Sequence, residues 1–296
     1  MVMQQLSFHD DVTVNYTPLE KSGSFDIEVR TNRYYLPADR RNLAYQAAEL
    51  MARDERAAGS VAPGKILINI KKRIPVAGGL AGGSGNAAAV LHALNVIWDL
   101  HLSLKELMDL GAELGSDVPF CVMGQARANK DLPDYLKNDP MAASCARATG
   151  RGTDLEALPA LKTWIVIAKP RFSVSTKEVY EGIDGIDILS RPDNDRLAET
   201  MRVRQSKGLK KDGGGVRPTK KMYADFINVL ELYTLDAYPE VRELKETMKA
   251  AGAEYALMSG SGPTVFGIFK TLAAAKKAAR MLQYDRYTAY WTKTML

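Results

Sequence analysis

The chain reads Pro75-Val76-Ala77-Gly78-Gly79-Leu80-Ala81-Gly82-Gly83-Ser84-Gly85 between a short alternating segment, 65–70, and an Ala- and Leu-rich segment, 87–98. The first is typical of a strand and the second of a helix. Five glycines between them let backbone N–H groups turn inward and approach an anion closely, because no Cβ atom obstructs them. A helix that begins near Gly85 adds free N–H groups and the positive end of its dipole. The segment therefore predicts a site for the phosphates of a nucleotide, and Ser84 can offer its hydroxyl to a phosphate or to a Mg²⁺ ion.

Three other interpretations fit this segment less well than a phosphate site. It is not a Walker A loop, because no Gly-Lys-Ser/Thr follows the glycines. It fits a dinucleotide fingerprint poorly, since Gly78 and Gly79 are adjacent and no acidic residue follows at the end of the next strand. A tight structural turn is the remaining alternative. Five glycines and a serine at a helix start favour phosphate binding over that alternative.

Strands and helices alternate along the rest of the chain without strict βαβ regularity, which predicts an α+β fold. Strands are expected within 10–30, on either side of a turn at Lys21-Ser22-Gly23, and at 65–70, 164–168, 254–258 and 264–269. Helices are expected at 41–56, 87–98, 103–114, 241–251 and 272–282. Ser103 with Glu106 three residues later forms the pattern of a capping box.

Length and composition set outer limits on the function. At 296 residues the chain is long enough for two modest domains. Two cysteines, Cys121 and Cys145, make neither a disulfide framework nor a metal-ligand set, so a reducing, cytoplasmic setting is expected. No apolar run approaches the roughly 20 residues of a membrane span. The net charge of +5 is mild and favours an anionic substrate, and no basic stripe with interleaved aromatics points to nucleic acid.

Two polar segments look like solvated loops or insertions. One covers 125–145 and contains Pro133 and Pro140. The other covers 202–221 and carries eight Lys or Arg against a single Asp. A nucleic-acid arm is the alternative for the second segment, but such charge runs are usually exposed and mobile.

Four motifs, in order, resemble those of the GHMP kinases. The glycine segment is similar to the family's Pro-x-x-x-Gly-Leu-x-x-Ser phosphate loop. The other three are Leu114-Gly115-Ser116-Asp117-Val118-Pro119-Phe120, Ala148-Thr149-Gly150-Arg151-Gly152 and Met258-Ser259-Gly260-Ser261-Gly262-Pro263-Thr264. Within the family they look most like the members that act on a cytidine diphosphate-linked polyol in non-mevalonate isoprenoid synthesis. A kinase of homoserine, mevalonate or a sugar fits the second and third motifs less well.

The resemblance implies the GHMP kinase fold. Residues 1–160 would form an ATP-binding domain like domain 2 of ribosomal protein S5. Residues 161–296 would form a ferredoxin-like domain, with the basic insertion near 202–221. It also implies ATP and Mg²⁺, a small-molecule substrate, no nucleic acid, no membrane, and a monomer or homodimer.

Site residues follow from the matching motifs. Asp117 is the candidate general base, because a carboxylate near the acceptor hydroxyl takes its proton as charge develops; an N-cap for the following helix is the alternative. The turn Ser259, Gly260, Ser261, Gly262 and Thr264 would support the phosphate loop, and a simple hairpin is its alternative. Tyr180 would stack on the cytosine ring, although a core tyrosine is almost equally compatible with the sequence.

The family pattern normally opens with Ala-Lys-Ile-Asn-Leu and an Asp-Gly-Tyr-His turn, whereas Met1-Val2-Met3-Gln4 resembles the segment just after that turn. A start recorded downstream of the true one, a truncated product, and a nucleotide-binding relic are the three explanations. Lys71 and Lys72 belong to the strand before the loop, so no lysine replaces the missing one by motif. The chain as written is expected to turn over far more slowly than a full-length relative, and equal rates in a coupled ATP assay would contradict this.

Overall fold

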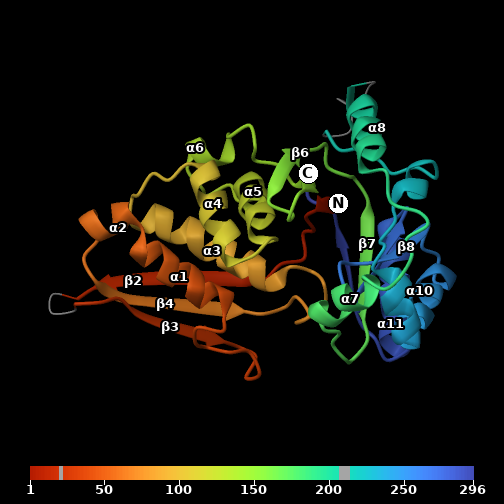
Figure 1. Ribbon diagram of the computed structural model, residues 1–296, viewed down its shortest axis with the longest axis horizontal. Helices are drawn as coiled ribbons and strands as arrows, with labels where there is room; N and C mark the ends of the chain where they lie inside the picture. The colour runs from red at the N-terminus through yellow and green to blue at the C-terminus, as the bar shows by residue number, and fades with distance from the viewer. Residues whose placement is uncertain (20–22, 207–213) are drawn as a thin grey trace. The chain divides into compact units, whose positions relative to one another are not determined.

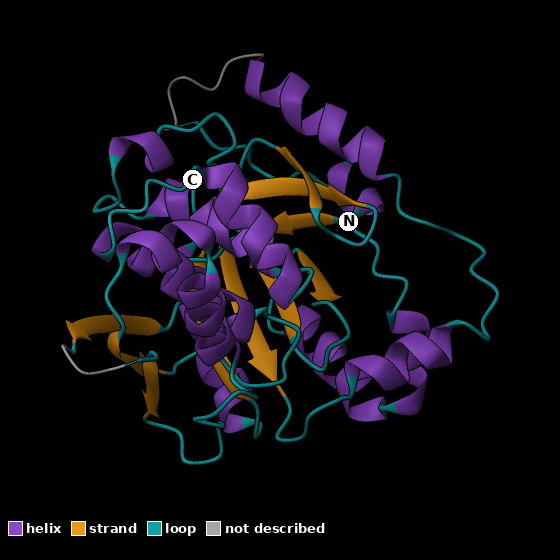
Figure 2. Cartoon of the chain, turned by 60° about the vertical axis from the view of Figure 1, so that its left-hand side comes forward, coloured by secondary structure: helices purple, strands orange, loops and turns teal. Residues whose placement is uncertain are grey.

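The computed structural model describes residues 1–19, 23–206 and 214–296 of the chain. These residues form two compact units. Unit 1 contains residues 1–5, 9–74 and 81–158, and unit 2 contains residues 6–8, 75–80 and 159–296. Helices and strands are both abundant in the chain, as expected for an α+β fold (Figure 2). Of the expected turn at Lys21-Ser22-Gly23, the first two residues lie outside the described part.

Unit 1 has two small sheets. In the first, β4 (Gly64–Lys71) lies between β2 (Asp11–Pro18) and β3 (Asp26–Thr31), antiparallel to β2 and parallel to β3. The strands expected within 10–30 are therefore present, but β4 separates them. In the second sheet, β5 (Cys145–Thr149) pairs with β1 (Val2–Gln4) and β6 (Asp154–Ala157), with Val2 opposite Arg147.

Helices cover one face of the β2-β4-β3 sheet (Figure 1). The helices in contact with the sheet are α1 (Leu43–Arg53) and α3 (Gly82–Ile97). The other helices of the unit pack on these two or on one another, and they are α2 (Glu55–Ser60), α4 (Leu104–Leu114), α5 (Val118–Ala128) and α6 (Asp134–Lys137). The sheet contributes Ile66, Ile68 and Ile70 to the core of unit 1, because alternate residues of β4 point to the buried face. Leu91 and Leu94 of α3 pack in the same cluster. Apolar burial of this kind is the main stabilising term of the unit.

Unit 2 contains the ferredoxin-like arrangement that was expected. Its sheet has the order β10-β7-β9-β8, with all neighbours antiparallel. The strands are β7 (Trp164–Lys169), β8 (Tyr255–Met258), β9 (Val265–Phe269) and β10 (Thr288–Lys293). The helices are α7 (Thr176–Ile183), α8 (Asn194–Ser206), α9 (Glu231–Ala237), α10 (Pro239–Ala250) and α11 (Leu272–Tyr284), with a short 3₁₀ turn, η2, at Met222–Asp225. Along the chain, β7, α10, β8, β9, α11 and β10 follow one another in the order βαββαβ, which is that of a ferredoxin-like fold.

Two helix predictions differ in outcome. The capping box is confirmed: the Ser103 hydroxyl accepts from the Glu106 N–H, and the Glu106 carboxylate accepts from the Ser103 N–H. The helix expected at 41–56 is present as α1, but it ends at Arg53, because the backbone at Asp54 is extended and its side chain accepts a hydrogen bond from the Arg56 N–H. Asp54 thus caps a new helix, α2, since a short acidic side chain competes with helix continuation.

Both segments expected to be solvated are partly packed into the units. Leu132 and Leu136, within 125–145, are buried in the core of unit 1. Within 202–221, α8 continues to Ser206, and Val216 is fully buried and bridges Leu161. Residues 207–213 lie outside the described part. The apolar residues interspersed among the charges explain this burial. In the parts of the chain that the structure describes, no helix is long and apolar enough to cross a membrane.

His92 is a buried titratable group in the core of unit 1. Its Nε2 lies 2.9 Å from the Val122 carbonyl oxygen, which makes Nε2 the donor, and Nδ1 is buried without a partner among the described residues. Burial lowers the pKa of His92 to about 4 from the usual 6.5, because the charged imidazolium would lose its solvation.

The His92 imidazole should therefore make stability depend on pH. Between pH 6.5 and 4 the unfolded chain binds a proton that the folded chain does not, so stability is present above pH 6.5 and lost as the pH falls toward 4. The expected loss from this one group is about 3 kcal/mol. Urea unfolding at pH 7 and pH 4 measures it as a difference between the unmodified chain and His92→Gln, which keeps an N–H donor but does not titrate. Equal losses for both chains would refute the assignment.

Candidate functional site

The helix after the glycine segment starts earlier than expected. α3 begins at Gly82, and its N-cap, Ala81, has a left-handed backbone with φ of 49°. The Gly85 N–H is bonded to the Ala81 carbonyl oxygen, so it is not one of the free donors. The first-turn N–H groups without an intrahelical partner are those of Gly82, Gly83 and Ser84. The expected start near Gly85 is wrong, because Gly82 and Gly83 take part in the first turn of the helix despite the poor helix propensity of glycine.

A buried ion pair lies beside this helix start in unit 1. Lys72 Nζ and Asp10 Oδ2 are 2.5 Å apart, and their side chains are 5% and 2% exposed. A Cβ added at Gly82 would lie 2.7 Å from Lys72 Nζ, so the ammonium adjoins the first residue of α3. Asp10 Oδ1 also accepts from the backbone N–H groups of Arg73 and Ile74. The pair thus anchors the end of β4 next to the free N–H groups of the helix.

Asn86 completes this cluster when its amide is oriented to donate. Its amide nitrogen then lies 2.9 Å from Asp10 Oδ2 and 3.2 Å from the Gly82 carbonyl oxygen. Lys72 was not recognised as a site residue in the sequence. The signal was the alternation of β4: Ile66, Ile68 and Ile70 are buried, and continuing by two residues places Lys72 on the same face.

The first half of the glycine segment, Pro75–Leu80, contacts the turn at 259–264 within unit 2. The Ser259 hydroxyl donates to the Gly79 carbonyl oxygen at 2.7 Å. Gly79 and Gly260 both have positive φ, and a Cβ at Gly260 would lie 3.4 Å from the Gly79 carbonyl oxygen. The Ser261 hydroxyl is 2.9 Å from the Thr176 hydroxyl at the start of α7. The turn is therefore more than a hairpin, since it packs directly on the loop that it was expected to support.

Gly79 offers a direct test of this contact. A Cβ there would lie 2.2 Å from the Ser259 carbonyl oxygen, and backbone must move to accommodate it. Gly79→Ala is expected to destabilise the chain by about 2–4 kcal/mol and to weaken nucleotide binding, through the clash and the left-handed backbone. Urea unfolding and ATP titration measure the two effects.

Gly85→Ala is the matched control, because a Cβ there meets nothing closer than Gln125 Nε2 at 4.0 Å. Alanine at this helical position should leave stability unchanged or raise it by up to about 1 kcal/mol. Similar destabilisation by both substitutions would mean that the Gly79 contact does not matter.

Asp117 stands at the N-cap of α5 but makes no capping hydrogen bond. Its carboxylate has no hydrogen-bond or ion-pair partner among the described residues, and burial raises the pKa of Asp117. A capping aspartate would accept an N–H bond and gain from it. The alternative structural role is thus not the one observed, and the geometry leaves a half-buried carboxylate available to a ligand.

The Gly150-Arg151-Gly152 turn lies next to the Asp117 segment in unit 1. It joins β5 to β6, and Gly150 and Gly152 have φ of 58° and 96°. A Cβ at Gly152 would be 3.6 Å from the Ser116 Cβ. Two motifs far apart in the sequence therefore meet in this unit.

Tyr180 lies on α7 and is 51% exposed, so a core role is excluded for it. Its helix is fixed from the other side, where Glu178 accepts from the hydroxyls of Tyr233 and Tyr238 at 3.1 and 2.6 Å. A Cβ at Gly182 of α7 would lie 2.3 Å from the ring of Tyr233 on α9, so these two helices approach closely. An exposed tyrosine on an anchored helix is suited to stacking on a planar ring.

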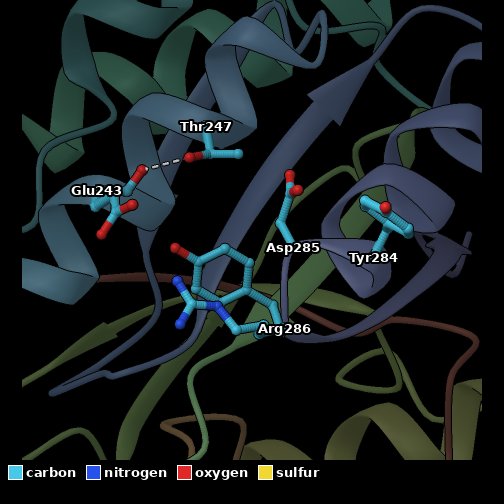
Figure 3. A pocket seen from close by; sticks show the side chains of 6 residues that line it. Glu243, Thr247, Tyr284, Asp285 and Arg286 are labelled. Atoms are coloured by element: carbon cyan, nitrogen blue, oxygen red, sulfur yellow. Dashed lines mark hydrogen bonds between the residues drawn. The ribbon is translucent and has the colours of Figure 1, made fainter.

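One hollow of unit 2 is not the predicted site. It measures about 500 Å³ and is lined by Glu243 and Thr247 of α10 and by the segment 284–287 (Figure 3). The Thr247 hydroxyl donates to the Glu243 carbonyl oxygen across one turn of α10. None of the predicted phosphate-loop, turn or substrate residues lines it, and its walls mix acidic and basic side chains.

Comparisons with known proteins identify the family. Residues 42–125 match the GHMP kinases N terminal domain, and residues 191–287 match the GHMP kinases C terminal model. The 4-diphosphocytidyl-2-C-methyl-D-erythritol kinase of Alkaliphilus metalliredigens (strain QYMF) is 41% identical over 296 residues, which cover all of this chain and 86% of that protein. The chain belongs to the 4-diphosphocytidyl-2-C-methyl-D-erythritol kinase family of GHMP kinases. A member of this family from Listeria monocytogenes serotype 4b (strain CLIP80459) is 40% identical over 260 residues, covering 88% of this chain and 76% of the relative.

Solved structures of GHMP kinases agree with the family assignment. A crystal structure of 4-(cytidine 5'-diphospho)-2C-methyl-D-erythritol kinase matches with a TM-score of 0.70 and 26% identity, covering 99% of this chain and 88% of that one. Homoserine kinase from Cytophaga hutchinsonii matches with a TM-score of 0.66 at 16% identity, covering 99% and 88% of the two chains, which shows a shared fold alone. The GHMP kinase fold predicted from the four motifs is confirmed.

Proposed function

We propose that this chain transfers the γ-phosphoryl group of ATP to the 2-hydroxyl of 4-diphosphocytidyl-2-C-methyl-D-erythritol. The activity is that named for its relatives at about 40% identity. The structural observation that supports it most is Asp117, a carboxylate at a helix N-cap that caps nothing and has no partner among the described residues. Such a group is available to accept a proton from an acceptor hydroxyl.

The nucleotide phosphates are assigned to Pro75–Gly85. Phosphoryl transfer relies on positioning and on donors aimed at the transferred group rather than on covalent chemistry by the protein. The free N–H groups of Gly82, Gly83 and Ser84 are such donors, and the helix dipole adds to them. Lys72 places a buried positive charge beside the same helix start. The turn at 259–264 holds the other half of the loop.

Asp117 acts as general base in this proposal. As the hydroxyl oxygen forms a bond to the γ-phosphorus, its proton passes to the Asp117 carboxylate. The bond between the γ-phosphorus and the bridging oxygen breaks, and its electron pair stays on the ADP that leaves. Burial raises the pKa of Asp117, which makes the carboxylate a better proton acceptor than an exposed aspartate. Tyr180 is assigned to the cytosine ring, where base stacking on an aromatic face contributes about 1–3 kcal/mol.

The Ser84 hydroxyl is suited to a Mg²⁺ ion that arrives with ATP. Mg²⁺ keeps several waters and takes one or two protein oxygens in addition to phosphates. Ser84, with its hydroxyl in the first turn of α3, is the proposed ligand. When bound, the ion would neutralise charge on the phosphates. Among the described residues no group of three His, Cys, Asp or Glu forms a metal site of the protein's own.

Thermal shift with two ligands and a coupled assay with the acceptor together test the proposal. ATP with Mg²⁺ and cytidine diphosphate should each raise the melting temperature, and a coupled assay with the acceptor should show ADP release. Stabilisation by ATP alone, without turnover, would instead favour a nucleotide-binding relic of the family. Turnover with homoserine or mevalonate, but not with the cytidine-linked acceptor, would favour another GHMP kinase activity.

A further inference from the structure

Lys169, the last residue of β7, carries a buried ammonium in unit 2. The residue is 7% exposed, and Nζ donates to the carbonyl oxygens of Phe172 and, at 3.3 Å, of Pro170. No carboxylate pairs with it among the described residues. A buried cation without a counter-charge is costly, and burial accordingly lowers the pKa of Lys169.

The stem of this lysine packs against the phosphate loop. A Cβ added at Gly78 would lie 3.3 Å from Lys169 Cδ and 2.8 Å from Thr264 Oγ1. Thr264 is fully buried, and its hydroxyl has no partner among the described residues. Lys169 and Thr264 therefore form the surface on which Gly78 rests, and any larger residue at position 78 would displace the loop.

A purely structural role accounts for only part of this arrangement. The two carbonyl contacts hold the 170–172 turn, which leads from β7 to α7, but a neutral amide could donate both bonds. The contacts use two of the three ammonium N–H groups. Neither the positive charge nor its place under the loop is explained by the turn, whereas an anion on the loop would explain both.

We propose that Lys169 supplies positive charge to the polyphosphate of a nucleotide held by the Pro75–Leu80 half of the loop. The inference rests on the proposed function and adds Lys169 to the residues that bind the nucleotide. In the low-dielectric surroundings of Gly78 the field of one ammonium is weakly screened, so its effect should grow with the number of phosphate charges. The ligand class is a nucleoside di- or triphosphate.

Lys169→Met tests the charge, because methionine keeps an unbranched apolar stem but has no ammonium. Calorimetric titration with ATP, ADP and adenosine is the measurement. ATP affinity is expected to fall about tenfold or more, ADP affinity less, and adenosine affinity not at all. Lys169→Arg should retain most of the ATP affinity. Lys177→Met, on an exposed part of α7, is the matched control and should change none of the three.

Lys169→Gln guards against misfolding, because glutamine can still donate to the two carbonyls while being neutral. It should show the same ATP-selective loss with an unchanged melting temperature. Equal losses for ATP and adenosine, or no loss for either, in a folded variant would overturn the inference and leave the proposed function standing. Failure of the unmodified chain to bind ATP at all would instead overturn the proposed function, and the inference with it.

Discussion

Asp117→Asn is expected to lower kcat by about 10²–10⁴-fold relative to the unmodified chain, while ATP affinity stays within a factor of about two. The substitution keeps the shape of the side chain but removes its ability to accept the hydroxyl proton. Removal of an interaction that is made only in the transition state lowers kcat and kcat/KM together. Steady-state kinetics with both substrates and an ATP titration measure these quantities.

Stability separates the catalytic role of Asp117 from a capping role. Because the carboxylate makes no capping bond and burial disfavours its charge, the neutral asparagine should leave the free energy of unfolding unchanged or raise it. Loss of a true N-cap would instead cost about 1 kcal/mol. Asp109→Asn, at an exposed position of α4, is the control and should alter neither rate nor stability measurably. A variant that retains more than a tenth of the rate would end the general-base assignment.

The second large effect concerns the buried pair of Asp10 and Lys72. Asp10→Asn is expected to lower the free energy of unfolding by about 3–5 kcal/mol, because it leaves the Lys72 ammonium buried without its counter-charge. Combining it with Lys72→Met should recover much of the loss, since the double variant buries no unpaired charge. Urea denaturation of both single variants and the double variant gives the coupling energy directly.

Lys65→Met is the matched control for the pair, because Lys65 lies on β4, the strand that ends next to Lys72, but pairs with Glu28 at the surface. Its loss should cost less than about 1 kcal/mol. The double variant is also expected to bind ATP more weakly than the unmodified chain, since the positive charge beside Gly82 is gone. Full ATP affinity in the double variant would confine the pair to a structural role.

Local signals in the sequence predicted most elements of the fold. The capping box at Ser103, the alternation of β4 and the apolar runs of β7 and β9 act within a few residues, so they could be read without tertiary information. The interposition of β4 between β2 and β3 could not, because strand pairing depends on contacts far apart in the sequence.

The site was predicted to a different degree from the fold. The sequence motifs predicted Asp117 and the two glycine-rich segments as site residues, but they predicted no role for Lys72 or Lys169, whose importance comes from burial. The start of α3 was misplaced because glycine has poor helix propensity, and the left-handed backbone of Ala81 that begins the helix is a tertiary effect.

The pairing of β1 with β5 has a consequence for biosynthesis. Val2 is synthesised well before its partner Arg147. During that interval the backbone N–H and C=O groups of β1 have no strand to pair with, and an unpaired strand is a template for wrong partners. The β2-β4-β3 sheet needs only residues 11–71 and can form sooner. Folding during synthesis should therefore begin with this sheet, and the pairing of β1 with β5 should follow later.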